Sequence, residues 1–220
     1  MKKAIIAIFA VGAMLTSCSD NGEKAVTKEA EKVVDKVETK NTQKFTNLKS
    51  PSYVKWRASH LGGLQPRYGK IMVEKAIVSV DDGKVTYGLV VLNMGSLTVE
   101  NFPEGSEQTG KLKGHLQNKD FFDMTKYPTA RFKLTSVKEV TGKYNAVITG
   151  NLTIKDVTKS ITFNALVEVS DEQVSINSED FSVDRTDWGL TYHVEGSKGV
   201  PIDYLIANDI GFTISLTLSK

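Results

Sequence analysis

Apolar and polar residues alternate along much of the chain that follows residue 52. The alternation is clearest over residues 146–154, 161–169 and 210–218, where Phe212 and Ile214 flank Thr213. Successive side chains of a β-strand point to opposite faces, so this period predicts strands with one apolar and one solvated face. Weaker runs complete a set of about eight expected strands: residues 53–59, 69–80, 84–94, 129–140 and 173–185.

The connections between these runs are short. Turn signals such as Asp82-Gly83, Thr141-Gly142 and Lys155-Asp156 separate several of them, and short links favour antiparallel neighbours. Antiparallel strands with one apolar face can pack as a sandwich or close into a barrel without exposed edges. The period does not choose between these folds. The interior of an eight-stranded barrel is either filled by side chains or holds one small ligand.

Residues 110–127 break the alternation between the third and fourth expected strands. Leu112, Leu116 and the Phe121-Phe122 pair do not follow a period of two. This segment predicts a short helix and a hydrophobic plug near one end of the sheet. Pro128 ends it, because proline cannot continue a helix.

The first eighteen residues read as a targeting signal. Lys2 and Lys3 precede an apolar run from Ala4 to Leu15, which is too short to span a bilayer but typical of a signal peptide. The run ends in Leu15-Thr16-Ser17-Cys18, which resembles the lipobox of bacterial lipoproteins. We therefore expect a signal peptide over residues 1–17 and lipidation of Cys18. Each buried methylene contributes about 0.8 kcal/mol, so two or three acyl chains would anchor the protein to a membrane.

The segment from residue 19 to residue 50 is rich in charge. It holds seven Lys, six acidic residues and a single aromatic residue, Phe45. Val26, Ala30 and Val33 fall at helical spacing, but so narrow an apolar stripe has nothing nearby in sequence to pack against. We expect a solvated, partly helical spacer. The change of composition at Pro51 then divides the mature chain into a lipidated spacer, residues 18–50, and a barrel domain, residues 51–220.

Charge and motif content exclude several functions. Without Lys2 and Lys3, the 28 basic residues become 26, equal to the 26 acidic residues, so nothing indicates binding to nucleic acid. One cysteine and three scattered histidines offer no zinc site, and we expect no metal. The sequence lacks a nucleophile elbow, a dinucleotide fingerprint, a P-loop and a zinc-protease helix motif.

Four carboxylates lie close together in sequence at Glu179, Asp180, Asp184 and Asp187. Paired carboxylates are what a glycoside hydrolase requires. The same residues suit a turn that is held by aspartate side chains. A hydrolase that uses residues 179–187 therefore stays as an alternative, although we expect no enzymatic activity.

Several motifs together are similar to one protein family. Leu116-x-x-x-Asp120-Phe121-Phe122-Asp123 is followed by Tyr127-Pro128-x-Ala130-x-Phe132. Downstream lie residues 150–154, the Val157-Thr158-Lys159 segment, Phe181, and residues 184–189. In this order, over residues 51–220, the chain resembles the YceI-like family of periplasmic polyisoprenoid-binding proteins, and in particular its lipoprotein members.

The resemblance implies a binding protein with a lipocalin-like barrel, about eight antiparallel strands and a short helix between strands three and four. Its interior would hold a polyisoprenoid or quinone-like lipid, for carriage, storage or sensing, and no other cofactor. Members of the family can form homodimers. With the signal peptide and Cys18, the resemblance indicates a lipid-anchored protein of the bacterial cell envelope that faces the periplasm or the cell surface.

The residues expected to line the lipid site come from the apolar faces of the strands: Phe132, Leu134, Ile148, Leu152, Ile161, Phe163, Phe212, Ile214 and Leu216, with Tyr87, Leu89 and Val91 added from the third strand. Arg67, Tyr68, Arg131 and Arg185 are available for a polar head group. Branched and aromatic residues would also fill a solid barrel. An envelope protein with a solid core and a protein partner is therefore a further alternative.

Overall fold

The computed structural model describes residues 22–33 and 39–220. The expected signal peptide and Cys18 lie outside these residues. Within the described ranges, no helix combines the length and the apolar character needed to cross a membrane.

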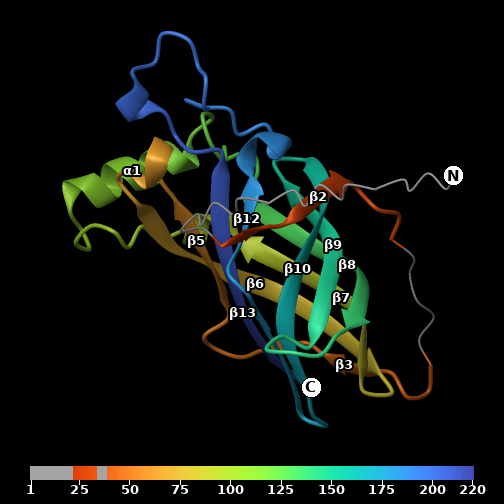
Figure 1. The fold of residues 1–220 in the computed structure, drawn as a ribbon. Coiled ribbons are helices and arrows are strands. Elements are labelled where there is room, and N and C mark those ends of the chain that lie inside the picture. Colours follow the sequence, from red (N-terminus) through yellow and green to blue (C-terminus); the bar gives the residue numbers. More distant parts are fainter. Residues whose placement is uncertain (1–21, 34–38) are drawn as a thin grey trace, which may run out of the picture.

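Eight antiparallel strands form a closed barrel, which confirms the barrel rather than the sandwich (Figure 1). Each strand pairs with the next along the chain, and the last strand returns to the first through the pairing of Phe212 with Trp56. The barrel strands are β5 (Tyr53–Ala58), β6 (Arg67–Asp81), β7 (Lys84–Asn93), β8 (Thr129–Glu139), β9 (Ala146–Ile154), β10 (Val157–Val169), β11 (Gln173–Ser178) and β13 (Asp209–Ser219). A short strand, β12 (Phe181–Asp184), continues the line of β11 and pairs with β13.

The inward faces of the strands are apolar, as the alternation predicts. Two clusters of buried side chains occupy the interior, one around Trp56, Phe163 and Trp188, and one around Phe45 and Leu218. Gly150 of β9 makes room for this packing, because a Cβ there would lie 2.3 Å from Cζ of Phe132. The barrel therefore needs a small residue at position 150, where a large ring crosses the strand.

Helix α1 (Glu107–Gln117) lies between β7 and β8 at one end of the barrel, which confirms the short helix expected there (Figure 1). The hydroxyl of Ser106 accepts a hydrogen bond from the Thr109 amide and caps its first turn. Short 3-10 turns occur at Leu61–Gly63, Met94–Ser96, Arg185–Trp188 and Ile202–Tyr204.

The expectation of a helical spacer is wrong for the described residues before Pro51. They form four short strands, β1 (Glu23–Lys24), β2 (Val26–Glu29), β3 (Gln43–Phe45) and β4 (Asn47–Leu48). Strand β2 pairs with β10, and β1 runs parallel to β12. Strands β3 and β4 pair with β6 and β13 at the end opposite α1 (Figure 1). Their pairing partners lie far away in sequence, so the local helical spacing does not decide the conformation.

Candidate functional site: an apolar cavity in the barrel

An apolar cavity occupies the half of the barrel nearest α1. The space not filled by protein atoms is about 1180 Å³, including the part open to solvent. Its wall comes from β5, β6, β7, β8, β9, β10, β12 and β13, and Leu116, Phe121 and Phe122 line it near α1. Among the residues that the structure describes, every lining residue apart from Arg185 is apolar. A second apolar space of about 500 Å³ continues toward the opposite end and shares Val90, Phe132, Ile214 and Leu216 with the first.

Nine of the residues expected to bind lipid face these spaces. Those on the larger cavity are Phe132, Leu152, Ile161, Phe212, Ile214 and Leu216. Those on the smaller space are Leu134, Ile148 and Phe163. Their contact with a ligand stays a prediction.

Tyr87, Leu89 and Val91 require a correction, because they line neither space. On β7 the inward residues are Gly88, Val90 and Leu92. The pairing of β6 with β7 shifts between Ser79 and Val80, so an extra residue on β7 reverses the faces beyond it. Tyr87 then lies on the outer face, where the Lys133 ammonium is 6.0 Å from its ring centroid. Residues 89–92 are apolar on both faces, so their sequence carries no sign of this reversal.

The structure also identifies lining residues that the sequence analysis missed. Val54, Trp56 and Ala58 of β5 and Ile71 and Val73 of β6 line the larger cavity. Their period-two spacing was a usable signal. Met94, Leu97 and Ile206 also line it, but they lie outside the barrel strands and show no such period.

Four phenylalanine rings follow one another across the wall from β8 to β13. Phe132 lies 5.8 Å from Phe163, Phe163 stacks on Phe181 at 4.7 Å, and Phe181 lies 6.0 Å from Phe212, measured between ring centroids. Phe132, Phe181 and Phe212 line the larger cavity, and Phe163 lines the smaller space. This aromatic surface suits a ligand held by apolar contact.

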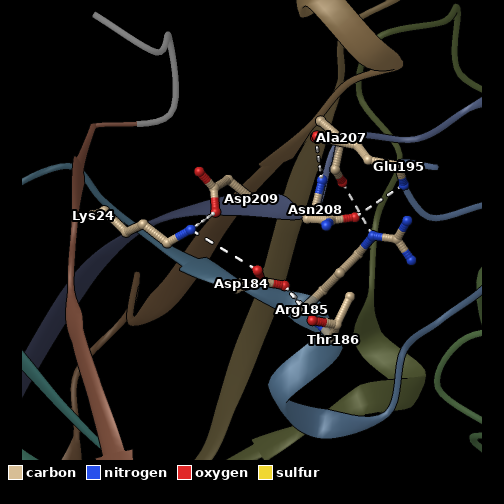
Figure 2. Close-up of polar contacts among 8 residues, drawn as sticks. All are labelled: Lys24, Asp184, Arg185, Thr186, Glu195, Ala207, Asn208 and Asp209. Atoms are coloured by element: carbon tan, nitrogen blue, oxygen red, sulfur yellow. Dashed lines mark hydrogen bonds and ion pairs between the residues drawn. The ribbon is translucent and has the colours of Figure 1, made fainter. Parts of the chain in front are cut away.

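Within the described part of the chain, Arg185 is the one charged residue on the cavity wall. Its guanidinium donates to the carbonyls of Leu190, Ile206 and Ala207 at 2.5, 3.0 and 3.1 Å. Figure 2 shows Arg185 beside Ala207. Asn208 and Glu195 lie next to Arg185 and form two hydrogen bonds with each other. Burial lowers the pKa of Arg185, while Asp184 and Glu195 act in the opposite direction. Of the four residues suggested for a head group, Arg185 lines the cavity; the Arg67 guanidinium instead lies over the Phe102 ring.

Glu179 and Asp184, two of the four carboxylates of residues 179–187, have structural partners. Glu179 accepts from the backbone and side-chain amides of Asn164 at 2.7 and 3.0 Å. Asp184 accepts from the amide and hydroxyl of Thr186 and caps the turn that follows, as a turn held by aspartate predicts (Figure 2). In the described ranges, no three His, Cys, Asp or Glu side chains are grouped to hold a metal.

Comparisons with a family model, with a curated relative and with solved structures agree with one another. A family model described as the YceI-like domain matches residues 25–218. A UPF0312 protein of Pseudomonas putida is 33% identical over 115 residues, which are 52% of this chain and 55% of that protein. The chain thus spans about half the length of that curated relative.

Two solved structures share the fold at low sequence identity. BcnA of Burkholderia cenocepacia superposes with a TM-score of 0.60 and 18% identity, over 78% of this chain and 99% of that chain. A polyisoprenoid binding domain from Saccharophagus degradans superposes with a TM-score of 0.57 and 11% identity, over 80% and 99%.

Proposed function

Because this chain belongs to the YceI-like family, we propose that it is a cell-envelope lipoprotein whose barrel binds a long apolar lipid of the polyisoprenoid type. The observation that carries the proposal is the cavity inside the barrel, which the described residues line with apolar side chains apart from Arg185. A space with this apolar and aromatic lining is typical of sites for apolar ligands. It counts against the alternative of a barrel with a solid core. The Saccharophagus degradans domain, described as polyisoprenoid binding, supports the ligand class.

The cavity favours such a lipid through burial of apolar surface. Each methylene moved from water to the cavity contributes about 0.8 kcal/mol before the cost of immobilising the chain. The aromatic surface from Phe132 to Phe212 can contact a branched tail along its length. The smaller space beyond Val90 extends the same apolar path toward the far end of the barrel. The tail therefore lies inside, and a polar head is directed to the end that carries Arg185.

The decisive experiment is native mass spectrometry of the chain from Ser19 to Lys220, secreted into a bacterial periplasm. This chain keeps every residue that the structure describes. We expect an added mass that organic extraction removes and that lipid analysis identifies as a prenyl compound. Protein without such a lipid, before as well as after extraction, would refute lipid binding.

The location in the envelope rests on residues 1–18, and we propose that lipidated Cys18 is its membrane anchor. The wild-type chain should incorporate radiolabelled palmitate and sediment with membranes. Cys18→Ser should lose the label. Placing Ser19 directly after a signal peptide that lacks a lipobox should release the protein into the soluble periplasmic fraction. Equal labelling of wild type and Cys18→Ser would contradict the anchor.

A further inference from the structure

One stretch of the barrel wall is completed by the N-terminal residues and not by a barrel strand. Residues 165–169 of β10 pair with β11, whereas residues 159–162 of β10 pair with β2. On the other side, β12 pairs with β1 and β13. We call residues 22–33 the strap, and the gap that it fills between β10 and β12 the seam. Figure 1 shows β2 lying along β10 at this place.

The seam leads directly into the cavity. Ile161 on β10 and Phe181 on β12 form its two edges, and both line the cavity. Each is only 2% exposed in the presence of the strap. Ala25 is the strap residue that packs against the apolar interior. Displacing the strap would therefore open the cavity sideways, with apolar residues on both edges.

Apart from its backbone pairing with β10 and β12, the strap is held mainly by partly exposed polar side-chain contacts. Lys24 Nζ lies 2.7 Å from Asp209 Oδ1 (Figure 2), and Lys159 Nζ lies 2.6 Å from Glu29 Oε1. Val26 is 56% exposed, so it contributes little buried apolar surface. Exposed ion pairs are weak, and segments with few buried apolar contacts open at low free energy. The barrel strands on either side of the strap lack this weakness, because their inward faces form the core.

The strap also begins next to the expected membrane anchor. Three residues separate Cys18 from Gly22, so the two Cα atoms can be at most about 14 Å apart. Gly22 has φ +83°, and a Cβ there would lie 2.1 Å from the Asp180 carbonyl oxygen. The glycine thus starts the strap in close contact with the residue before β12. An anchored Cys18 would hold this face of the barrel against the bilayer.

We propose that the seam is a lateral portal through which a prenyl-type lipid passes between the bilayer and the cavity when the strap detaches. The portal rests on the proposed lipid-binding function and adds the route by which the lipid enters and leaves the cavity. The membrane that holds Cys18 would supply or receive the lipid. The strap would thereby act as a removable wall strand and not as a spacer.

Disulfide locks test the portal. Val26 lies opposite Thr162 and Lys24 lies opposite Ser182, so cysteines at these four positions would fix both edges of the strap. The background is the chain from Ser19 to Lys220, which has no other cysteine. The assay is uptake of tritiated solanesol from vesicles of phosphatidylethanolamine and phosphatidylglycerol. We expect oxidation to slow uptake about tenfold or more, and reduction to restore it.

The matched control is Thr153→Cys with Thr158→Cys. Their hydroxyls lie 2.8 Å apart across β9 and β10, where the wall is already closed, so oxidation should leave uptake unchanged. Equal uptake by the oxidised and reduced locked protein would overturn the portal. Absence of uptake by every form, reduced and control proteins included, would instead refute the lipid-binding function itself.

A second variant acts in the opposite direction and needs no disulfide. The Asn151 side chain accepts from the Glu31 amide at 2.9 Å and donates to the Glu31 carbonyl at 2.7 Å. Asn151→Ala should loosen the strap and speed uptake about threefold or more. Asn145 makes the same two bonds to Val167, away from the strap, so Asn145→Ala is the control. Equal uptake rates of the two variants would contradict the portal.

Discussion

At the scale of single residues, Arg185 shows how the barrel keeps a charge beside an apolar cavity. Its side chain is 1% exposed, and a buried charge is costly unless it is fully hydrogen-bonded. The three carbonyls at residues 190, 206 and 207 meet this need and connect the turn after β12 to the loop before β13. The residue therefore holds the α1 end of the barrel together in addition to any contact with a ligand.

Replacing Arg185 by lysine should destabilise the protein by about 2–4 kcal/mol, because an ammonium cannot reproduce the planar guanidinium contacts with three carbonyls. Urea unfolding followed by tryptophan fluorescence measures the loss. Arg131→Lys, at an exposed position of β8, is the matched control and should change stability by less than about 0.5 kcal/mol. Similar losses in both variants would contradict the structural role of Arg185.

Asp180 gives a pH-dependent contribution next to the start of the strap. The Thr213 hydroxyl, which donates to its carboxylate, and the nearby Arg57 guanidinium hold the pKa of Asp180 below its ordinary value of 3.8. A lowered pKa in the folded state means that the carboxylate stabilises the fold above pH 3.8. This contribution is lost as the pH falls through the lowered pKa.

Asp180→Asn should therefore reduce stability at neutral pH, by less than about 1 kcal/mol, because the carboxylate is more than half exposed. The difference from the wild type should disappear as the pH falls below 3.8 and through the lowered pKa of Asp180. Urea unfolding of both proteins from neutral pH to acid measures the stability difference at each pH. A deficit that stays constant down to acid pH would show that the ionised carboxylate is not its source.

At the scale of elements, the alternation of β9, β10 and β13 was enough to predict which side chains face inward. It failed at β7, because residues 89–92 are apolar on both faces and the shift at Ser79 depends on pairing with β6. It also failed for β2, because Val26, Ala30 and Val33 fall at the spacing of a helix. There the pairing energy comes from β10, more than 120 residues away. Partners so distant in sequence cannot be deduced from a local pattern.

The corrected orientation of β7 can be tested with neighbouring residues. Val90 lines both spaces, whereas Val91 lines neither. Val90→Gln should place an amide among apolar groups, cost about 1–3 kcal/mol of stability and reduce the copurified lipid. Val91→Gln, on the outer face, should retain the lipid and cost less than about 1 kcal/mol. Denaturant unfolding and lipid quantification measure the two effects. A larger effect of Val91→Gln than of Val90→Gln would mean that Val91 faces inward, as the sequence alone predicted.

At the scale of the whole molecule, the sequence predicted a barrel only together with the family resemblance. The period of two is equally compatible with a sandwich. Closure of the barrel depends on the pairing of β5 with β13, which are the first and last barrel strands in the sequence. Whether the interior is hollow depends on how side chains from many strands fill it. The cavity arises because Gly88, Ala130 and other small residues face inward among the large ones. No single strand carries that information.

A hollow interior makes the stability of the molecule depend on its occupant. A lipid that binds only the folded barrel adds about 2.7 kcal/mol when its free concentration is a hundredfold above its dissociation constant. For a domain of this size, that corresponds to a rise of about 5–10 °C in the thermal midpoint. Extracted protein should therefore melt at a lower temperature than protein purified with lipid, and adding solanesol should reverse the change.

Differential scanning calorimetry measures this shift, with Val90→Gln and Val91→Gln as the matched pair. Val91→Gln should show the full change on extraction, because its cavity is intact. Val90→Gln should show a smaller one, because its lining carries a polar amide that disfavours an apolar ligand. The difference between the variants separates the effect of the ligand from any damage that the solvent causes to the fold. Equal shifts in both variants would mean that the stabilising lipid lies outside the cavity.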